Sequence, residues 1–194
     1  ENIATGTTIA TASASDPESQ TITYSLSGTG SEYFAVDSSG NVTLVAGLDY
    51  ETVSSYNLTL SVSDGVNTTT NTIAISISDV NEAPSLSSSL AASSFAENTA
   101  TGTTIATASA SDPESQPITY SLSGTGSENF AVDSSGNITL ASSLDYETTT
   151  SYSLTLTASD GTNSISDTIN ISVADVVELS ITLASSSITI DENA

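Results

Sequence analysis

Hydrophobic and polar residues alternate one by one along much of this chain. The alternation is clear in residues 21–26, 56–62 and 72–77. Successive side chains of a strand point to opposite faces, so this period predicts strands with one buried face and one solvent-facing side. Turn-forming pairs such as Asp16-Pro17 and Asp64-Gly65 separate the runs.

The alternation predicts six strands in the first part of the chain. They are expected at residues 7–14, 21–27, 33–37, 41–46, 54–63 and 70–79. Several short strands with one apolar face each are typical of two antiparallel sheets packed face to face. The fold class is therefore all-β, and a sandwich is the expected architecture.

A long internal repeat sets the domain organisation. Residues 1–80 recur as residues 97–176, and 60 of the 80 aligned positions are identical. Such close copies are typical of a tandem array. We expect a first repeat at residues 1–83, a second at 84–178, and the start of a third repeat or a donor strand at 179–194.

The opening strand distinguishes the two copies. A seventh strand is expected at residues 90–96, directly before Glu97, and Phe95 on it is expected in the core. Before Glu1 the sequence has no such segment, whereas a similar one occurs near residues 186–190. An arbitrary cut through a longer array of repeats would explain why the opening segment occurs at the end of the sequence and not at its start. Head-to-tail strand donation between molecules explains it too, and it would place Glu192 beside Glu1 of the next molecule.

The charge balance excludes several classes of partner. The chain has 23 acidic residues and no Lys, Arg or His, for a formal charge of −23. Nucleic acid and anionic membrane surfaces are excluded as partners, because binding to their phosphates relies largely on Lys and Arg. The chain has no Cys, which suits a secreted bacterial protein. No apolar run approaches the 18 residues of a membrane-spanning helix, so membrane insertion is not expected.

Most carboxylates occupy strand ends or turns, and sixteen of them form eight pairs separated by 96 positions. The first copy carries Glu1, Asp16, Glu18, Asp49, Glu51, Asp64, Asp79 and Glu82, and the second carries Glu97, Asp112, Glu114, Asp145, Glu147, Asp160, Asp175 and Glu178.

The strand ends of a sandwich gather at two poles, and this concentrates negative charge where repeats meet. Two like charges 4 Å apart repel by about 4 kcal/mol at an effective dielectric near 20. Calcium, which takes six to eight oxygen ligands, would remove this repulsion. We expect a Ca²⁺ site at the junction between the repeats, formed by Glu1, Asp49, Glu51, Asp79 and Glu82 of the first and Asp112, Glu114 and Asp160 of the second.

The order of these motifs resembles the cadherin repeat, in particular the cadherin-like repeats of large bacterial surface proteins. The motifs are Glu1-Asn2, Asp16-Pro17-Glu18, Leu48-Asp49-Tyr50-Glu51, Ser63-Asp64-Gly65 and the linker Asp79-Val80-Asn81-Glu82-Ala83-Pro84, and all but the full linker recur in the second copy. The resemblance covers nearly the whole chain.

The resemblance implies a seven-stranded Greek-key sandwich with calcium between successive domains. It adds Asn81 to the expected ligands. The linker is one residue shorter than the family pattern, and Glu18 stands where that pattern has a second Asp. After the second copy Val177 replaces Asn81, so a weaker calcium site is expected there.

The preferred interpretation is a calcium-binding structural repeat of an extracellular adhesin stalk or filament, at the cell surface or secreted, as in a biofilm. A glycan-binding module is the alternative, and Tyr33, which Asn129 replaces in the second copy, is its candidate aromatic platform. An enzyme is disfavoured. The Asp49/Glu51 pair resembles glycosidase carboxylates, but its repetition beside the linker favours metal binding.

Overall fold

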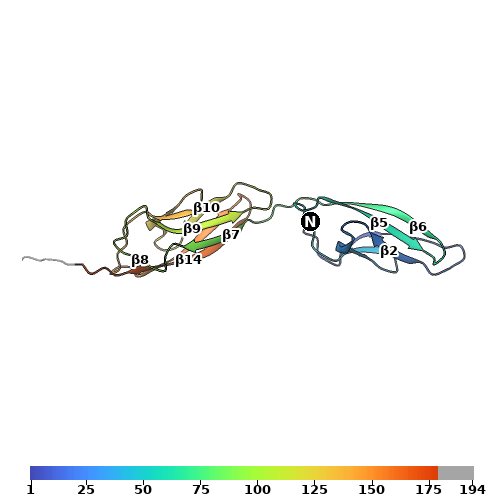
Figure 1. Cartoon of the computed structure of the whole chain (residues 1–194), viewed down its shortest axis with the longest axis horizontal. Coiled ribbons are helices and arrows are strands. Elements are labelled where there is room, and N and C mark those ends of the chain that lie inside the picture. Colours follow the sequence, from blue (N-terminus) through green and yellow to red (C-terminus); the bar gives the residue numbers. More distant parts are fainter. Residues whose placement is uncertain (179–194) are drawn as a thin grey trace, which may run out of the picture. The chain divides into compact units, whose positions relative to one another are not determined.

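The computed structural model describes residues 1–178, and the chain divides into two compact units, Glu1–Glu82 and a second unit that begins at Ala83. Apart from one short 3-10 helix in each unit, the regular secondary structure of both described units is β-strand (Figure 1). No helix among the described residues is long and apolar enough to cross a membrane.

Two three-stranded sheets make the first unit. One has the order β1-β4-β3, with β1 at Thr8–Thr11, β4 at Asn41–Leu44 and β3 at Phe34–Val36. The other has the order β2-β5-β6, with β2 at Thr23–Ser27, β5 at Ser55–Ser63 and β6 at Thr68–Ser76. A short 3-10 helix, η1 (Ser31–Tyr33), precedes β3. The six strands that the alternation predicted in this repeat are confirmed.

Two four-stranded sheets make the second unit. One has the order β11-β12-β9-β7, with β11 at Phe130–Val132, β12 at Asn137–Leu140, β9 at Thr104–Ser111 and β7 at Ser85–Leu90. The other has the order β10-β13-β14-β8, with β10 at Thr119–Ser123, β13 at Ser151–Ser159, β14 at Ser164–Ala174 and β8 at Phe95–Ala96. The 3-10 helix η2 (Ser127–Asn129) precedes β11.

Side-chain alternation decides which face of each strand enters the core. In β13 the apolar residues Tyr152, Leu154 and Leu156 are buried, while the polar residues between them are exposed. The Phe130 ring packs edge-on against Tyr152 at a centroid distance of 5.1 Å. Phe34 and Tyr56, the counterparts of this pair in the first unit, are packed in the same way at 5.4 Å.

The opening segment of the second unit differs from the expected single strand at residues 90–96. It starts earlier and splits into two strands, β7 and β8. β7 pairs antiparallel with β9, whereas β8 pairs in parallel with β14, with Phe95 opposite Val173. The break falls at residues 91–94, where the chain passes from one sheet to the other. Phe95 is buried in the core of this unit, as predicted.

Candidate metal centre

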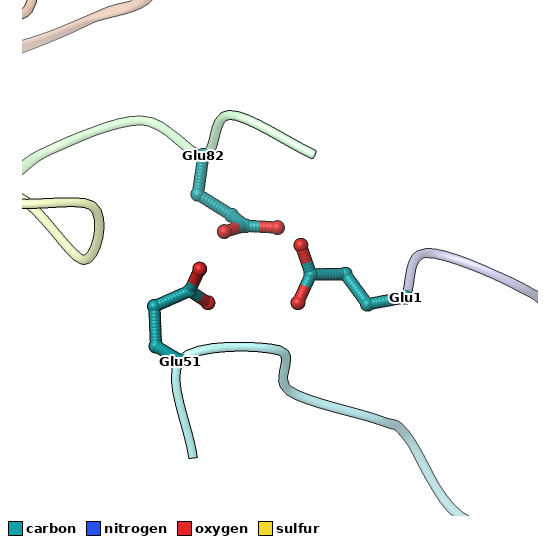
Figure 2. Close-up of side chains that lie close together, drawn as sticks. All are labelled: Glu1, Glu51 and Glu82. Atoms are coloured by element: carbon teal, nitrogen blue, oxygen red, sulfur yellow. The ribbon is translucent and has the colours of Figure 1, made fainter. Parts of the chain in front are cut away.

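Three carboxylates converge in the first unit. One oxygen from each of Glu1, Glu51 and Glu82 lies within 4.8 Å of the others. Figure 2 shows the three side chains pointing toward a common space from three separate segments. Glu1 precedes β1, Glu51 lies in the turn before β5, and Glu82 follows β6. Segments distant in sequence thus meet at one end of the unit.

The second unit repeats this arrangement with one substitution. Oxygens of Glu97, Glu147 and Asp175 lie within 4.8 Å of one another. Glu97 and Glu147 are the 96-residue counterparts of Glu1 and Glu51, whereas Asp175 is the counterpart of Asp79. Two of the three positions are therefore common to both groups, and the third comes in each case from the segment that leaves the last strand.

The first glutamate of each group is buried and tied to the backbone. Glu1 is 8 % exposed and Glu97 is 5 % exposed. The Glu97 oxygens accept hydrogen bonds from the backbone N–H of Tyr146, at 2.8 Å, and of Val176, at 2.7 Å. The backbone N–H of Glu97 in turn donates to the carbonyl of Ala174 at 3.1 Å. The Glu97 carboxylate therefore links the turn that contains Tyr146 to the segment that follows β14.

The same bonds recur at Glu1 and act on its protonation. Its oxygens accept from the backbone N–H of Tyr50 and of Val80, at 2.5 Å and 2.8 Å. The Tyr50 bond contributes most, and together the two bonds hold the pKa of the Glu1 carboxyl below its usual range, although partial burial opposes this. Glu1 is thus kept as an anion, the form that binds a cation.

Charge crowding acts on the exposed member of the second group. The backbone N–H of Glu147 itself lowers the pKa of this carboxyl. Partial desolvation and the negative charges of Glu97, Asp175 and Glu178 outweigh that effect and raise the pKa above its usual value. Since the chain has no Lys, Arg or His, no side chain can neutralise these charges.

The residues fit a hard divalent cation. All the donors are carboxylate oxygens, and Ca²⁺ prefers oxygen ligands at 2.3–2.6 Å. Two ligands of one such ion are separated by at most about 5 Å, so the spacing within 4.8 Å is compatible with a shared ion. A carboxylate has about four lone-pair sites, so the two N–H bonds to Glu1 or Glu97 leave acceptor capacity on each oxygen.

Other expected ligands make local contacts that stabilise turns. Asp49 is not in either three-carboxylate group of the described units, and its oxygens accept from the backbone N–H and the hydroxyl of Thr52 at 2.8 Å and 3.0 Å. Asp145 makes the same two bonds with Thr148, both at 2.9 Å. Their roles as metal ligands stay predictions.

Asp16 and Asp64 lie at the other end of the first unit. Both line one pocket of about 160 Å³. Asp64 follows β5, whereas Glu51 precedes it, and a nine-residue strand separates its ends by roughly 30 Å. Asp16 and Asp64, which we expected to bind calcium at a junction with another repeat, therefore lie at the opposite end of the unit from the group of Glu1, Glu51 and Glu82.

The remaining expected ligands are distributed as follows. Asp112 accepts from the backbone N–H of Gln116, and Asp160 accepts from those of Thr162 and Asn163. Glu18 and Glu114 lie in turns, and Asp79 and Glu178 are exposed. The side-chain amide of Asn81 donates a hydrogen bond to the carbonyl of Glu82. Glu192 lies outside the described residues. The convergence of residues from both repeats on one ion stays a prediction.

Tyr33 does not form an exposed aromatic platform. Its ring lies 5.7 Å from the Tyr56 ring, centroid to centroid, and is half-buried against the core of the first unit. This partial burial weakens the sequence-based support for the glycan-binding alternative, which stays a prediction.

Comparison with known proteins identifies the family of both repeats. The cadherin domain model matches residues 1–78 and 92–174. Among curated relatives, human cadherin-23 is 34 % identical over 167 residues, and the protocadherin-like wing polarity protein stan of Drosophila melanogaster is 36 % identical over 191 residues. These matches cover 82 % and 88 % of this chain, which spans only 5 % of the length of either relative.

Solved structures agree with this assignment. Domains EC1-2 of human protocadherin-24 superpose with a TM-score of 0.60 at 26 % identity, covering 89 % of this chain and 91 % of that one. Domains EC22-24 of mouse cadherin-23 superpose with a TM-score of 0.53 at 30 % identity, covering 91 % of this chain and 62 % of that one. Cadherin domains are extracellular adhesion modules that generally bind Ca²⁺. The chain belongs to the cadherin domain family.

Proposed function

We propose that this chain is a structural segment of an extracellular adhesin stalk or filament, stiffened by calcium at the ends of its repeats. The observation that carries the proposal is the recurrence of one carboxylate group in both units, built around Glu1 and Glu51 in the first and Glu97 and Glu147 in the second. Each group joins the start of a repeat to the segment that leaves it.

Calcium bound there would neutralise the crowded carboxylates. Glu1, Glu51 and Glu82 would hold an ion in the first unit, and Glu97, Glu147 and Asp175 would hold one in the second. Further ligands are expected from neighbouring repeats, with Asp112, Glu114 and Asp160 facing the first group. An ion in this position would restrict the outgoing segment, because it links that segment to the buried glutamate and to the turn before β5 or β13.

Each unit has its own core of alternating strand residues, so we expect calcium to add stability rather than to be required for folding. Extracellular calcium modules bind at roughly 10⁻⁴–10⁻³ M. At 100 times the dissociation constant, one bound ion stabilises the folded state by about 2.7 kcal/mol.

The bacterial origin and the biofilm setting belong to this proposal as well. They are supported by the absence of Cys and of every basic residue and by the near-identity of the two repeats. The relatives named above are animal proteins, so their partners and settings are not carried over. The expected partners are neighbouring repeats of the same protein.

Calcium titration tests the proposal. Isothermal titration calorimetry of the chain should show calcium uptake that the double variant Glu51→Gln/Glu147→Gln largely loses. The melting temperature should rise in calcium for the parent chain but not for this variant. The matched control is Glu32→Gln/Glu128→Gln, which removes the same charge from the exposed 3-10 helices. Equal calcium uptake by both double variants, or no effect of EDTA on melting of the parent chain, would contradict the proposal.

A further inference from the structure

A polar cavity of about 530 Å³ opens in the second unit beside η2 and the start of β13. Its wall includes Glu128 and Asn129 of η2, Asp145, and Tyr152 of β13, together with several Ser and Thr side chains. Cavities of about 300–1,000 Å³ are typical of small-molecule sites. Every residue of the wall belongs to this one unit, so the cavity is complete within a single repeat.

The first unit has the same backbone arrangement at the position of Asn129 but a different side chain. The carbonyl of Asn129 accepts a hydrogen bond from the backbone N–H of Ala141 at 2.7 Å. Tyr33, the 96-residue counterpart of Asn129, accepts the matching bond from Val45 at 2.8 Å. The side chain is therefore what distinguishes the two positions.

The Tyr33 ring occupies the space in the first unit that is open in the second. It lies 5.7 Å from the Tyr56 ring, centroid to centroid. Tyr152 is the counterpart of Tyr56, and both rings pack edge-on against a phenylalanine in the same way. Asn129 is much smaller than tyrosine, and its amide donates a hydrogen bond to the Tyr152 hydroxyl at 3.4 Å. The cavity thus lies where the second unit has an amide in place of an aromatic ring.

Two further replacements make the wall of the cavity more polar. Thr149 stands where the first unit has Val53, and Ser143 stands where it has Gly47. Tyr33 and Val53 pack against the hydrophobic core of the first unit, whereas their polar counterparts line the cavity. The second unit therefore has hydroxyl and amide groups where the first unit has apolar packing.

The charge of the wall excludes an anionic ligand. Glu128 and Asp145 are acidic, and the chain has no basic side chain to offset them. Neither belongs to a three-carboxylate group of the described units, so the metal-binding pattern does not extend to this cavity. Asp145 accepts two hydrogen bonds from Thr148. A carboxylate has about four lone-pair sites, so acceptor capacity remains for a ligand.

The neutral groups of the wall indicate the class of ligand. The two carboxylates recur in the first unit as Glu32 and Asp49, so negative charge does not distinguish the cavity. The polar groups that the second unit has gained are an amide and two hydroxyls, which both donate and accept hydrogen bonds. A neutral sugar presents many hydroxyls that also donate and accept. It matches these groups better than an organic ammonium ion, which only donates.

We propose that the cavity of the second unit binds a neutral saccharide. The Asn129 amide and the hydroxyls of Ser143 and Thr149 form hydrogen bonds with the sugar hydroxyls. Glu128 and Asp145 accept hydrogen bonds from further hydroxyls of the sugar. The site gives the repeat a binding activity beyond the proposed stiffening by calcium. It uses no metal, so sugar binding should be retained in EDTA, and its failure is distinguishable from a failure of calcium binding.

A glycan array provides the first test. The chain should bind neutral glycans both in calcium and in EDTA, and it should bind sialylated or sulfated glycans much less, because the carboxylates of the wall repel an anion. Methyl glycosides of glucose, galactose, mannose and N-acetylglucosamine are then titrated by NMR to about 20 mM, which detects millimolar dissociation constants. At least one of them should shift the side-chain amide signal of Asn129.

Asn129→Tyr should lower the affinity by about tenfold or more, because it places the aromatic ring of the first unit in the cavity. The variant should fold, since tyrosine occupies the matching position of the first unit. Asn170→Tyr is the matched control, the same change at an exposed residue of β14 outside the cavity. It should bind like the parent chain, and thermal denaturation checks that both variants are folded.

A converse variant should create a second site. The four changes Tyr33→Asn, Gly47→Ser, Val53→Thr and Asn57→Ser give the first unit the same residues that line the cavity of the second. NMR titration of this quadruple variant should show two shifted side-chain amides, that of Asn129 and that of the asparagine introduced at position 33. The parent chain should show only the first.

Several results would each overturn the proposal. One is a parent chain that binds no neutral glycan on the array and none of the four methyl glycosides. Another is an Asn129 signal that putrescine shifts and no sugar does, which would assign the cavity to a cation. Sugar binding that Asn129→Tyr leaves unchanged would place the site elsewhere. A folded quadruple variant that gains no second site would show that these residues do not form it.

Discussion

Oε2 of Glu97 lies 2.8 Å from the backbone nitrogen of Tyr146, 49 positions away in the sequence. This bond fixes the turn that carries Glu147 relative to the start of the repeat. The same bond joins Glu1 to Tyr50 in the first unit. The candidate metal centre is therefore preorganised by a buried carboxylate that also belongs to it.

Phe95→Ala should destabilise the second unit by about 3–5 kcal/mol, because it removes a large buried side chain and leaves a cavity. Chemical denaturation, read at a signal of the second unit, measures the loss. Val177→Ala, at a residue that is 94 % exposed, is the control and should leave the free energy of unfolding unchanged. A loss below 1 kcal/mol would show that Phe95 is not the side chain that closes this core.

Gly126→Ala should destabilise the second unit by about 1–3 kcal/mol. Gly126 has φ of +80°, a conformation that costs a side-chain-bearing residue about this much. A Cβ there would also lie 2.6 Å from the Tyr152 ring. Gly47→Ala is the matched control, because Gly47 has no positive φ and its Cβ would meet nothing within 4 Å. Thermal denaturation of both variants checks the difference.

Val177→Asn should strengthen calcium binding at the end of the second repeat several-fold. It restores the amide oxygen that we expect Asn81 to offer after the first repeat, and oxygen atoms of this kind are the ligands that calcium prefers. Calorimetric titration of the variant against the parent chain measures the change. Val177→Ala, which adds no oxygen, should bind like the parent, and equal affinities for all three chains would remove position 177 from the site.

Acid should weaken the loops at Asp37 and Asp133. Hydrogen bonds from the side chain and backbone of Asn137 hold the pKa of Asp133 below its usual value, and Asn41 acts in the same way on Asp37. A lowered folded-state pKa means that the stabilisation is fully present above the unfolded pKa of about 3.9. It is lost as the pH falls through the folded pKa.

Unfolding free energies between pH 7 and pH 2 test this dependence. Asp37→Asn/Asp133→Asn should be less stable than the parent chain at pH 7, and the difference should narrow as the pH falls below about 4. The exposed pair Glu32→Gln/Glu128→Gln is the charge-matched control. A constant difference across the whole pH range would mean that these carboxylates do not stabilise their loops in the charged form.

The strands were predictable from sequence because the core side chains alternate so regularly. Tyr152, Leu154 and Leu156 on β13 show the period directly. β7 was not predicted, because its sequence is Ser-Leu-Ser-Ser-Ser-Leu and serine has little preference for strands. Its pairing with β9 is a long-range contact that the local pattern does not encode.

The candidate site was predictable in part for a similar reason. Repetition at an offset of 96 identified Glu1, Glu51 and Glu82 as members of a set. Sequence could not separate Glu51 from its neighbour Asp49, which instead caps its own turn through Thr52. Which of two nearby carboxylates faces the common space depends on the turn geometry, and no spacing rule specifies it.

The parallel pairing of β8 with β14 also determines how the second unit would respond to tension. The chain enters through the opening segment and leaves through β14, and the two strands run in the same direction. A pull on the two ends of the repeat would slide these strands past each other, so their hydrogen bonds would be loaded together in shear instead of being unzipped one at a time. The bonds of Glu97 to Ala174 and Val176 join the same two segments just beyond the paired residues, so they would resist the same sliding. The two-residue strand β8 would therefore contribute to the resistance of the whole repeat to stretching.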